Sequence, residues 1–279
     1  MRLQDSPGEW ASGLGLYRSK FVGTHWMLLV LSDLGLGKAN RWIETACNRW
    51  MERHSKDDGG FGFERAKESH LCITGNMLRA LVKFGYADHP RVRSGFGWLV
   101  ENQKMNGGWN CWGKDGVLDG WEGMSAFAVY PRAMWKRKMN EAVAKGAEFY
   151  LKHEVTNQGQ KYEPWYRLHY PVHYFYDVLV GLDFMTALGY GSDSRLQQAV
   201  RNLIAKRAGD GRWNLDAVHP DVEGSIRRYY REHPAEAPKP FALEKAGNPS
   251  KMITLRALVV LKRLDSQRSR GPWRVVPSS

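Results

Sequence analysis

A short pattern recurs along the chain at a nearly constant interval, and this repetition restricts the chain to repeat architectures. The clearest copy is residues 98–109, Trp-Leu-Val-Glu-Asn-Gln-Lys-Met-Asn-Gly-Gly-Trp. An earlier copy, residues 50–61, keeps the spacing, and a third ends at Trp213. The first two copies end 48 residues apart and the next two 104 apart, so a degenerate unit of about 52 residues, near 145–159, lies between. Such periods are typical of helical arrays.

Each copy follows a pair of helical patterns, and the first member of each pair is the more apolar. Helices that are apolar around most of their circumference are buried on all sides. The second members carry charges on one face and apolar residues at i, i+3 and i+4, which is typical of half-exposed helices. The sequence therefore predicts inner helices at 24–34, 70–84, 121–134, 174–188 and 250–264, and outer helices at 39–54, 90–103, 140–153 and 194–207.

The spacing Trp-Leu-x3-Gln-x3-Gly-x-Trp at 98–109, with Arg93 upstream, resembles the QW motif of squalene-hopene cyclases. The expected helix pairs resemble the α/α toroid that these cyclases share with protein prenyltransferase β subunits. The resemblance spans roughly residues 20 to 265. It implies an all-α toroid of concentric inner and outer helices, in which Gln103 binds backbone groups of the next repeat and Trp109 stacks on it.

The repeats predict one toroid domain over residues 1–265, with an irregular insertion at 216–247 and a basic tail at 266–279. The insertion is long enough to fold over the mouth of the ring as a lid. Five inner helices but four outer ones are expected, whereas a complete ring of this family has six pairs. The ring is then incomplete, capped by the insertion, or completed by another subunit such as a second copy of the chain.

Composition restricts the environment of the protein. The 12 Trp, 12 Tyr and 10 Phe residues either pack the core or line a central cavity. No apolar run approaches the roughly 18 residues of a membrane span, and the first residues do not resemble a signal peptide, so we expect a cytoplasmic protein. Three cysteines at unrelated spacings do not form a disulfide framework.

The net charge of +12 suggests either an anionic partner or a well-solvated surface, since most of the basic residues fall at expected outer-helix or tail positions where solubility accounts for them. An acidic membrane surface, contacted peripherally, and a diphosphate both fit. No nucleic-acid-binding motif accompanies the basic clusters, so specific nucleic-acid binding is not expected.

Polar residues at the starts of the inner helices indicate where chemistry takes place. If the inner helices are parallel, their N-termini crowd one rim of the ring and favour anions there. The polar residues expected at this rim are His25, His70, Cys72, Asp119, Glu122, His173, Tyr174, Tyr176, Asp177 and Lys251.

The resemblance also limits the reaction. Class II cyclases of the family protonate an alkene with Asp-x-Asp-Asp, whereas residues 174–177 read Tyr-Phe-Tyr-Asp and retain only Asp177. A phenol with a pKa near 10 is a poor acid for this step. Asp57-Asp58 continues as Gly-Gly-Phe, so the magnesium motif of class I terpene synthases is also missing. We therefore expect no squalene-type cyclisation.

A zinc site is suggested by the protein prenyltransferases, which use Asp-x-Cys on one inner helix and His on a later one. His70, Cys72 and Asp177, or His173 beside it, supply the same ligand types in a permuted order. Three such ligands with an open fourth position describe a catalytic zinc site. Cys111 is expected to be a packed small residue.

Other candidates have structural explanations. Asp119 and Glu122 fit a capping box at a helix start, with Asp119 as the N-cap and Glu122 three residues later. The pair Asn248-Pro249 fits the start of the last helix in the same way.

The leading hypothesis is a prenyltransferase-like or terpene cyclase-like enzyme that holds an isoprenoid or similar apolar substrate in a central aromatic cavity. Its expected catalytic residues are Asp177, Tyr176 and His173, and its expected substrate-binding residues are Tyr174, Trp121, Glu122, His25 and Lys251. One alternative is a non-catalytic toroid that binds a partner through its basic surface. Another is a carbohydrate-active helical barrel, which requires a carboxylate pair such as Asp177 with Glu122 across the cavity.

Overall fold

The computed structural model describes residues 5–11, 15–16, 19, 22–157, 159, 162–173, 175–218, 232 and 243–268. The described part is mainly helical, as the sequence predicted. Its α-helices are α1 (Thr24–Asp33), α2 (Arg41–His54), α3 (Leu71–Lys83), α4 (Pro90–Glu101), α5 (Glu122–Val129), α6 (Arg137–Lys152), α7 (Val178–Ala187), α8 (Gln197–Ala205) and α10 (Lys251–Arg268). Short 3-10 helices are η1 (Arg132–Met134), η2 (Glu163–Tyr166) and η3 (Ser194–Leu196).

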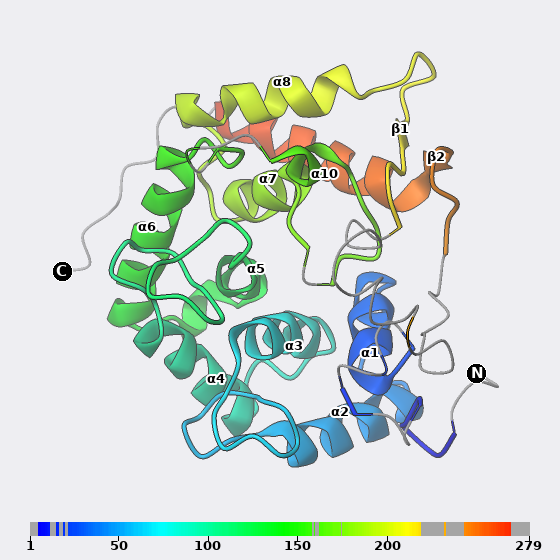
Figure 1. The fold of residues 1–279 in the computed structure, drawn as a ribbon, viewed down its shortest axis with the longest axis vertical. Coiled ribbons are helices and arrows are strands. Elements are labelled where there is room, and N and C mark those ends of the chain that lie inside the picture. Colours follow the sequence, from blue (N-terminus) through cyan, green and yellow to red (C-terminus); the bar gives the residue numbers. More distant parts are fainter. Residues whose placement is uncertain are drawn as a thin grey trace.

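The helices form an interior group and a peripheral group (Figure 1). In the interior, α1 packs on α3, α3 on α5, α5 on α7, and α7 on α10. Helices α2, α4, α6 and α8 lie outside them, and each contacts the interior helix that precedes it in the chain. A short antiparallel pair of strands, β1 (Trp213–Asn214) and β2 (Pro249–Ser250), joins the segment after α8 to the start of α10.

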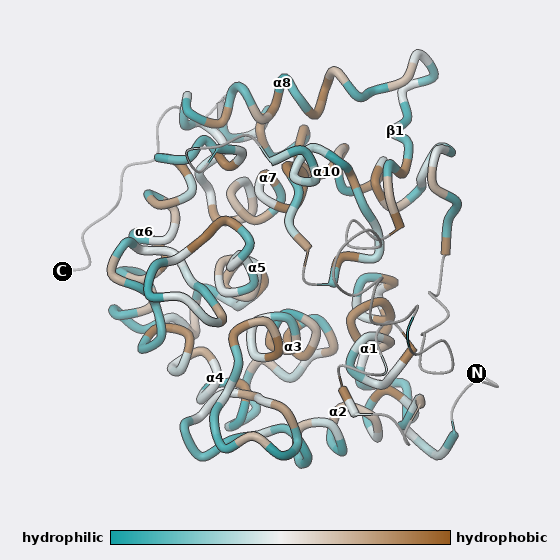
Figure 2. The backbone as a smooth tube through the Cα atoms, in the orientation of Figure 1, coloured by the Kyte–Doolittle hydropathy of each residue, from teal (hydrophilic) through white to brown (hydrophobic). Residues whose placement is uncertain are grey.

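Side-chain composition explains this division. Helix α7 is Val-Leu-Val-Gly-Leu-Asp-Phe-Met-Thr-Ala, and all of its residues except Asp183 and Ala187 are buried. Helix α8 instead alternates between hydrophilic and hydrophobic residues (Figure 2), and it buries only Ala199, Val200 and Leu203. A helix that is apolar on every side belongs in the interior, whereas an amphipathic one covers it.

Trp109 and Gln103 connect neighbouring repeats. The indole of Trp109 is 1% exposed, and its Nε1 donates a hydrogen bond to the Leu99 carbonyl at 2.8 Å. It lies so close to Gly123 of α5 and Gly146 of α6 that a Cβ at either glycine would come within 3 Å of the ring. Gln103 Nε2 donates to the Ala142 carbonyl of α6 at 2.7 Å. These contacts join α4 to the next helix pair, as the pattern predicted.

The other copies repeat parts of this arrangement. Trp213 Nε1 donates to the Leu203 carbonyl at 2.7 Å, with the same ten-residue separation as Trp109 and Leu99. The N–H of Phe61 donates to the Thr74 hydroxyl of α3, and the N–H of Trp213 donates to the Thr254 hydroxyl of α10. The aromatic end of each of these two copies is therefore bound to the following interior helix.

Two interior helices begin or end at other residues than the sequence predicted. The helix expected at 121–134 is divided, because Pro131 removes a backbone donor and Tyr130 before it is extended. The helix expected at 174–188 begins only at Val178, since Asp177 has an extended backbone and caps it. His173 and Asp177 therefore precede α7 instead of lying within its first turn.

The insertion expected at 216–247 and the basic tail fall mostly outside the described residues. Of the described helices, none combines the length and the apolar composition needed to cross a membrane.

We predict that Trp109→Ala lowers the free energy of unfolding by roughly 3 to 5 kcal/mol, because it removes a large buried ring. Trp112→Ala is the matched control: this indole is 84% exposed, so its loss should change stability by less than about 0.5 kcal/mol. Urea denaturation of both variants measures the difference. Equal stability of the two would show that Trp109 does not hold the repeats together.

Candidate metal centre

His70 and Cys72 lie at the N-terminal end of α3. His70 is the N-cap residue and has an extended backbone. Its N–H donates a hydrogen bond to the Phe61 carbonyl at 2.8 Å. Cys72 follows in the first turn of the helix. His70 is 8% exposed and Cys72 is 9% exposed, so both side chains are buried close to the surface.

Cys111 comes from the loop between α4 and α5, directly after the Trp109 contact. Asn110 shapes this loop: its side chain donates to the Asp115 carbonyl at 2.8 Å and accepts from the Trp112 N–H at 3.1 Å. Trp109 pairs with Val117 in a β-bridge at the base of the loop. These bonds hold Cys111 against the start of α3.

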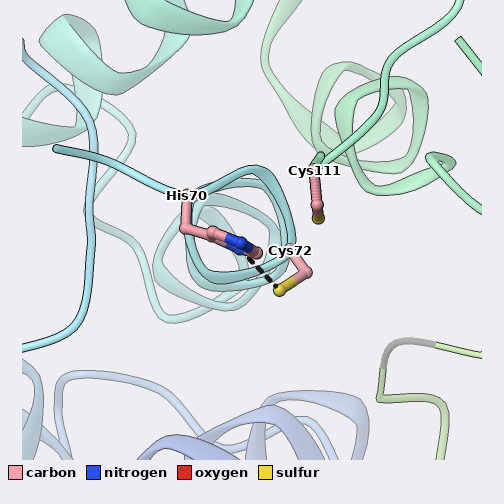
Figure 3. A group of neighbouring side chains, drawn as sticks. All are labelled: His70, Cys72 and Cys111. Carbon is pink, nitrogen blue, oxygen red and sulfur yellow. Dashed lines mark hydrogen bonds between the residues drawn. The ribbon is translucent and has the colours of Figure 1, made fainter. Parts of the chain in front are cut away.

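The three side chains form a compact cluster (Figure 3). One ligand atom from each of His70, Cys72 and Cys111 lies within 4.8 Å of the other two, and His70 Nδ1 is 3.1 Å from Cys72 Sγ. A tetrahedral zinc ion bound at about 2.3 Å to sulfur and 2.0 to 2.1 Å to nitrogen places its ligand atoms about 3.5 to 3.8 Å apart. Movements of roughly 1 Å would bring the cluster to this geometry, so these residues fit zinc.

The surroundings of the cluster favour a thiolate. The pKa of the Cys111 thiol is lowered to about 5, because the Cys72 side chain hydrogen-bonds to it and His70 lies beside it. The imidazole of His70 contacts two aromatic rings, Phe63 at 5.3 Å and Trp112 at 4.6 Å between centroids. One side of the cluster is therefore apolar, and the exposed Trp112 extends from it into solvent.

Glu122 is a buried carboxyl at the start of α5. It lies against Gly75 of α3, and it is 2% exposed. Its Oε2 has no hydrogen-bond partner among the described residues. Burial, and then the negative charge of Cys111, raise the pKa of Glu122 well above its usual value. Both effects disfavour the charged form of this carboxyl.

The expected capping box is not formed. Trp121 occupies the N-cap position of α5, and the Asp119 carboxylate accepts from Trp165 Nε1 at 3.0 Å instead. A Cβ at Gly120 would overlap with the Trp109 carbonyl oxygen, so the position before the helix requires glycine. At the other end of the chain, Ser250 caps α10 by accepting from the Ile253 N–H at 2.9 Å.

Asp177 lies apart from the cysteine cluster and is fully enclosed. Its carboxylate bonds to His169 Nδ1 at 2.7 Å and accepts from the N–H groups of His169 at 3.0 Å and Val180 at 2.8 Å. Burial alone would raise the pKa of Asp177, but His169, Arg256 and the Val180 N–H together hold it below its ordinary value. Asp177 therefore caps α7 and pairs with His169. The third member of the cluster with His70 and Cys72 is Cys111, and not Asp177 as we expected.

The other predicted residues are also placed outside this cluster. The Tyr176 hydroxyl donates to the Val155 carbonyl at 2.5 Å, and His173 packs edge-on against Trp26. His25 packs against Trp26 and Trp50, and burial lowers its pKa to about 3. Lys251 is exposed at the start of α10. Tyr174 lies outside the described residues.

Trp121 contacts a second feature that the sequence did not predict, a charged cavity between the interior helices. Its ring lies 5.2 Å from the Arg79 guanidinium, and both residues line a cavity of about 180 Å³. Residues of α1, α3, α5, α7 and α10 line this cavity, and six of them are charged. Its size and charge differ from the aromatic cavity that we expected.

Comparison with known proteins adds no family assignment, since no protein-family model matches the chain and no curated protein sequence is significantly similar to it.

The sequence did not identify Cys111 as a metal ligand, because the other copies of the repeat have no cysteine at the corresponding position. The useful signal is the repeat itself: the loop after Phe61 leads to the start of α3, and the loop after Trp109 reaches the same side of the molecule. A cysteine two residues after Trp109 is thereby brought to the two ligands at the start of α3.

We predict that Asp177→Asn lowers the free energy of unfolding by about 3 kcal/mol at pH 7, because an amide donor would then face the donors of His169. The pKa of Asp177 is lowered in the folded state, so its stabilising effect is present above the unfolded pKa of about 3.9 and is lost as the pH falls through the folded value. Urea denaturation at pH 7 and near pH 3 should show that the gap between the two proteins narrows in acid. A gap of the same size at both pH values would contradict this role.

We also predict that the purified protein holds about one zinc ion per chain. Cys111→Ser should weaken zinc binding by more than the roughly 10- to 100-fold that indirect changes cause. Cys47→Ala is the matched control, since Cys47 is a separate buried thiol whose pKa is raised to about 12 by burial. Elemental analysis and competition with a chelator provide the measurement. Equal zinc content in all three proteins would exclude the cluster as the metal site.

Proposed function

We propose that the protein is a zinc-dependent enzyme of the α/α-toroid type, which transfers an isoprenoid or similar apolar group to a thiol. The observation that carries this proposal is the convergence of His70, Cys72 and Cys111 at the start of α3. The toroid is supported by the order of the interior contacts, α1 to α3 to α5 to α7 to α10, with the other helices outside.

The protein's own residues supply three of four ligands. When bound, zinc would hold a thiol at the remaining position and lower its pKa, which makes the sulfur nucleophilic at neutral pH. Two thiolates and one imidazole neutralise the charge of the ion, so a substrate thiolate there stays electron-rich. His70 is fixed by its backbone bond to Phe61, and Cys111 by the Asn110 turn.

An apolar substrate fits beside the cluster better than inside the ring. The interior cavity of about 180 Å³ is too small and too charged for a long hydrocarbon chain. Beside the cluster, Trp112 is 84% exposed, and its ring lies 4.6 Å from the His70 imidazole between centroids. Exposed large apolar side chains next to a reactive site are typical of an apolar ligand surface. We therefore place the substrate on this loop.

Glu122 has the properties of a proton-holding group for this site. It is buried, its pKa is raised by burial and by the charge of Cys111, and it lies within electrostatic range of that thiol. A carboxyl with a raised pKa keeps its proton to a higher pH than a free glutamate side chain does, which suits a general acid.

A reducing compartment suits this chemistry. The three cysteines are free thiols, and the cluster binds metal only when Cys72 and Cys111 are reduced. This supports a cytoplasmic location for the proposed enzyme.

A second candidate function is binding through the basic surface, and one groove favours it. The groove has a volume of about 650 Å³ and lies between α4 and α6. Met134 and Met139 contribute apolar surface, and Arg93, Lys136 and Lys138 outnumber the single acid Glu101. It suits an acidic partner, such as an anionic membrane surface. The carbohydrate hypothesis has no comparable support, because neither Asp177 nor Glu122 lines the interior cavity.

We predict that the zinc-loaded protein converts farnesyl diphosphate and a small cysteine derivative into a thioether, with release of diphosphate and of the thiol proton; mass spectrometry detects the product. Cys111→Ser should abolish the product, and Cys47→Ala should leave it unchanged. Trp112→Ala should lower kcat/KM by about tenfold or more without loss of zinc, because it removes an apolar contact. A protein that binds zinc at this cluster but forms no thioether would contradict the proposed reaction while leaving the metal site intact.

A further inference from the structure

The interior cavity opens where the C-terminal ends of four helices meet. Asp33, Lys83, Val129 and Ala187 are the last residues of α1, α3, α5 and α7, and all four line it. The cavity mouth is therefore on the side opposite the cysteine cluster: His70 and Lys83 lie at the two ends of α3, 13 residues or about 20 Å apart along the helix.

The charged residues at the mouth are paired with each other. Lys83 Nζ is 2.6 Å from Asp33 Oδ1, and Arg263 Nη1 is 2.7 Å from Asp183 Oδ1. Lys83, Arg263 and Asp183 are about one third exposed, so solvent reaches this end of the cavity. These two pairs leave no excess charge at the entrance.

The excess positive charge lies deeper. Arg79 of α3 is 6% exposed and has no carboxylate within 4 Å among the described residues. Its Nη2 donates to the Val172 carbonyl at 3.0 Å, while its Nε has no hydrogen-bond partner. Arg256 of α10 shares Asp183 with Arg263, at 3.5 Å, and its Nη1 is likewise unsatisfied.

Both of these arginines line the cavity, Arg79 from α3 and Arg256 from α10. Buried polar groups are almost always hydrogen-bonded, and an unpaired buried charge is costly. Two guanidinium groups with unsatisfied N–H donors on one cavity indicate a missing acceptor.

We propose that this cavity is a binding site for a phosphate dianion, either free or at the end of a small phosphomonoester, held by Arg79 and Arg256. The cavity lining contains four cations and two carboxylates, so a doubly charged anion balances it. Arginine is the preferred partner of phosphate, because its planar guanidinium can donate two parallel hydrogen bonds to an oxyanion. The open mouth leaves room for the organic part of an ester.

The negative C-terminal ends of the nearby helices do not neutralise the charge of Arg79. The C-terminal ends of α1, α3, α5 and α7 carry partial negative charge, but this effect is confined to the last turn of each helix. Lys83 lies in the last turn of α3, whereas Arg79 lies more than one turn deeper. The site is separate from the proposed zinc centre and does not depend on it.

Isothermal titration with inorganic phosphate, at constant ionic strength, tests the proposal on the full chain. Saturable binding of one phosphate per chain is expected, with acetate binding at least about tenfold more weakly because it carries one charge. Arg79→Gln should weaken phosphate binding by about 30-fold or more.

Lys138→Gln is the matched control, because it removes one positive charge from the exposed groove on α6 and should leave phosphate affinity unchanged within about twofold. Glycerol phosphate distinguishes the ligand source, since tighter binding than inorganic phosphate assigns an ester. Absence of saturable phosphate binding to the unmodified protein, with water satisfying the donors, overturns the proposal. Equal losses in Lys138→Gln and Arg79→Gln would also overturn it, since they would show a general charge effect.

Discussion

The burial of Trp109 between Gly123 and Gly146 is the contact on which the rest of the structure depends. It fixes α4, α5 and α6 relative to one another, and Gln103 extends the connection to Ala142 of α6. Because Cys111 follows Trp109 by only two residues, the same contact sets the loop that delivers the third ligand to His70 and Cys72. A motif that holds repeats together thus also positions the proposed metal centre.

The helix pairs could be predicted from the sequence because their cause is local. Apolar periodicity separated α3 and α7 from the amphipathic outer helices, and repetition placed Trp109 at a repeat boundary. The break at Pro131 was also visible in the sequence but was outweighed by the apolar pattern around it. Limits such as the start of α7 depend on Asp177 bonding to His169, a contact that the pattern does not encode.

The site was less accessible to sequence analysis, because its chemistry depends on which side chains meet in space. His70 and Cys72 were identified by their place at a helix start, but a carboxylate was expected where Cys111 lies. Asp177 has a satisfied ion pair and cap instead, so its charge serves the fold. The cavity charges of Arg79 and Arg256 were also hidden, since both residues lie in stretches that read as ordinary interior helices.

The most direct test of the metal centre is X-ray absorption spectroscopy at the zinc edge of the zinc-loaded protein. The geometry of His70, Cys72 and Cys111 predicts two sulfur ligands at about 2.3 Å, one imidazole nitrogen at about 2.0 to 2.1 Å, and one further light atom. Four sulfur ligands, or a first shell made only of nitrogen and oxygen, would contradict the account, because neither is compatible with this cluster in a single chain.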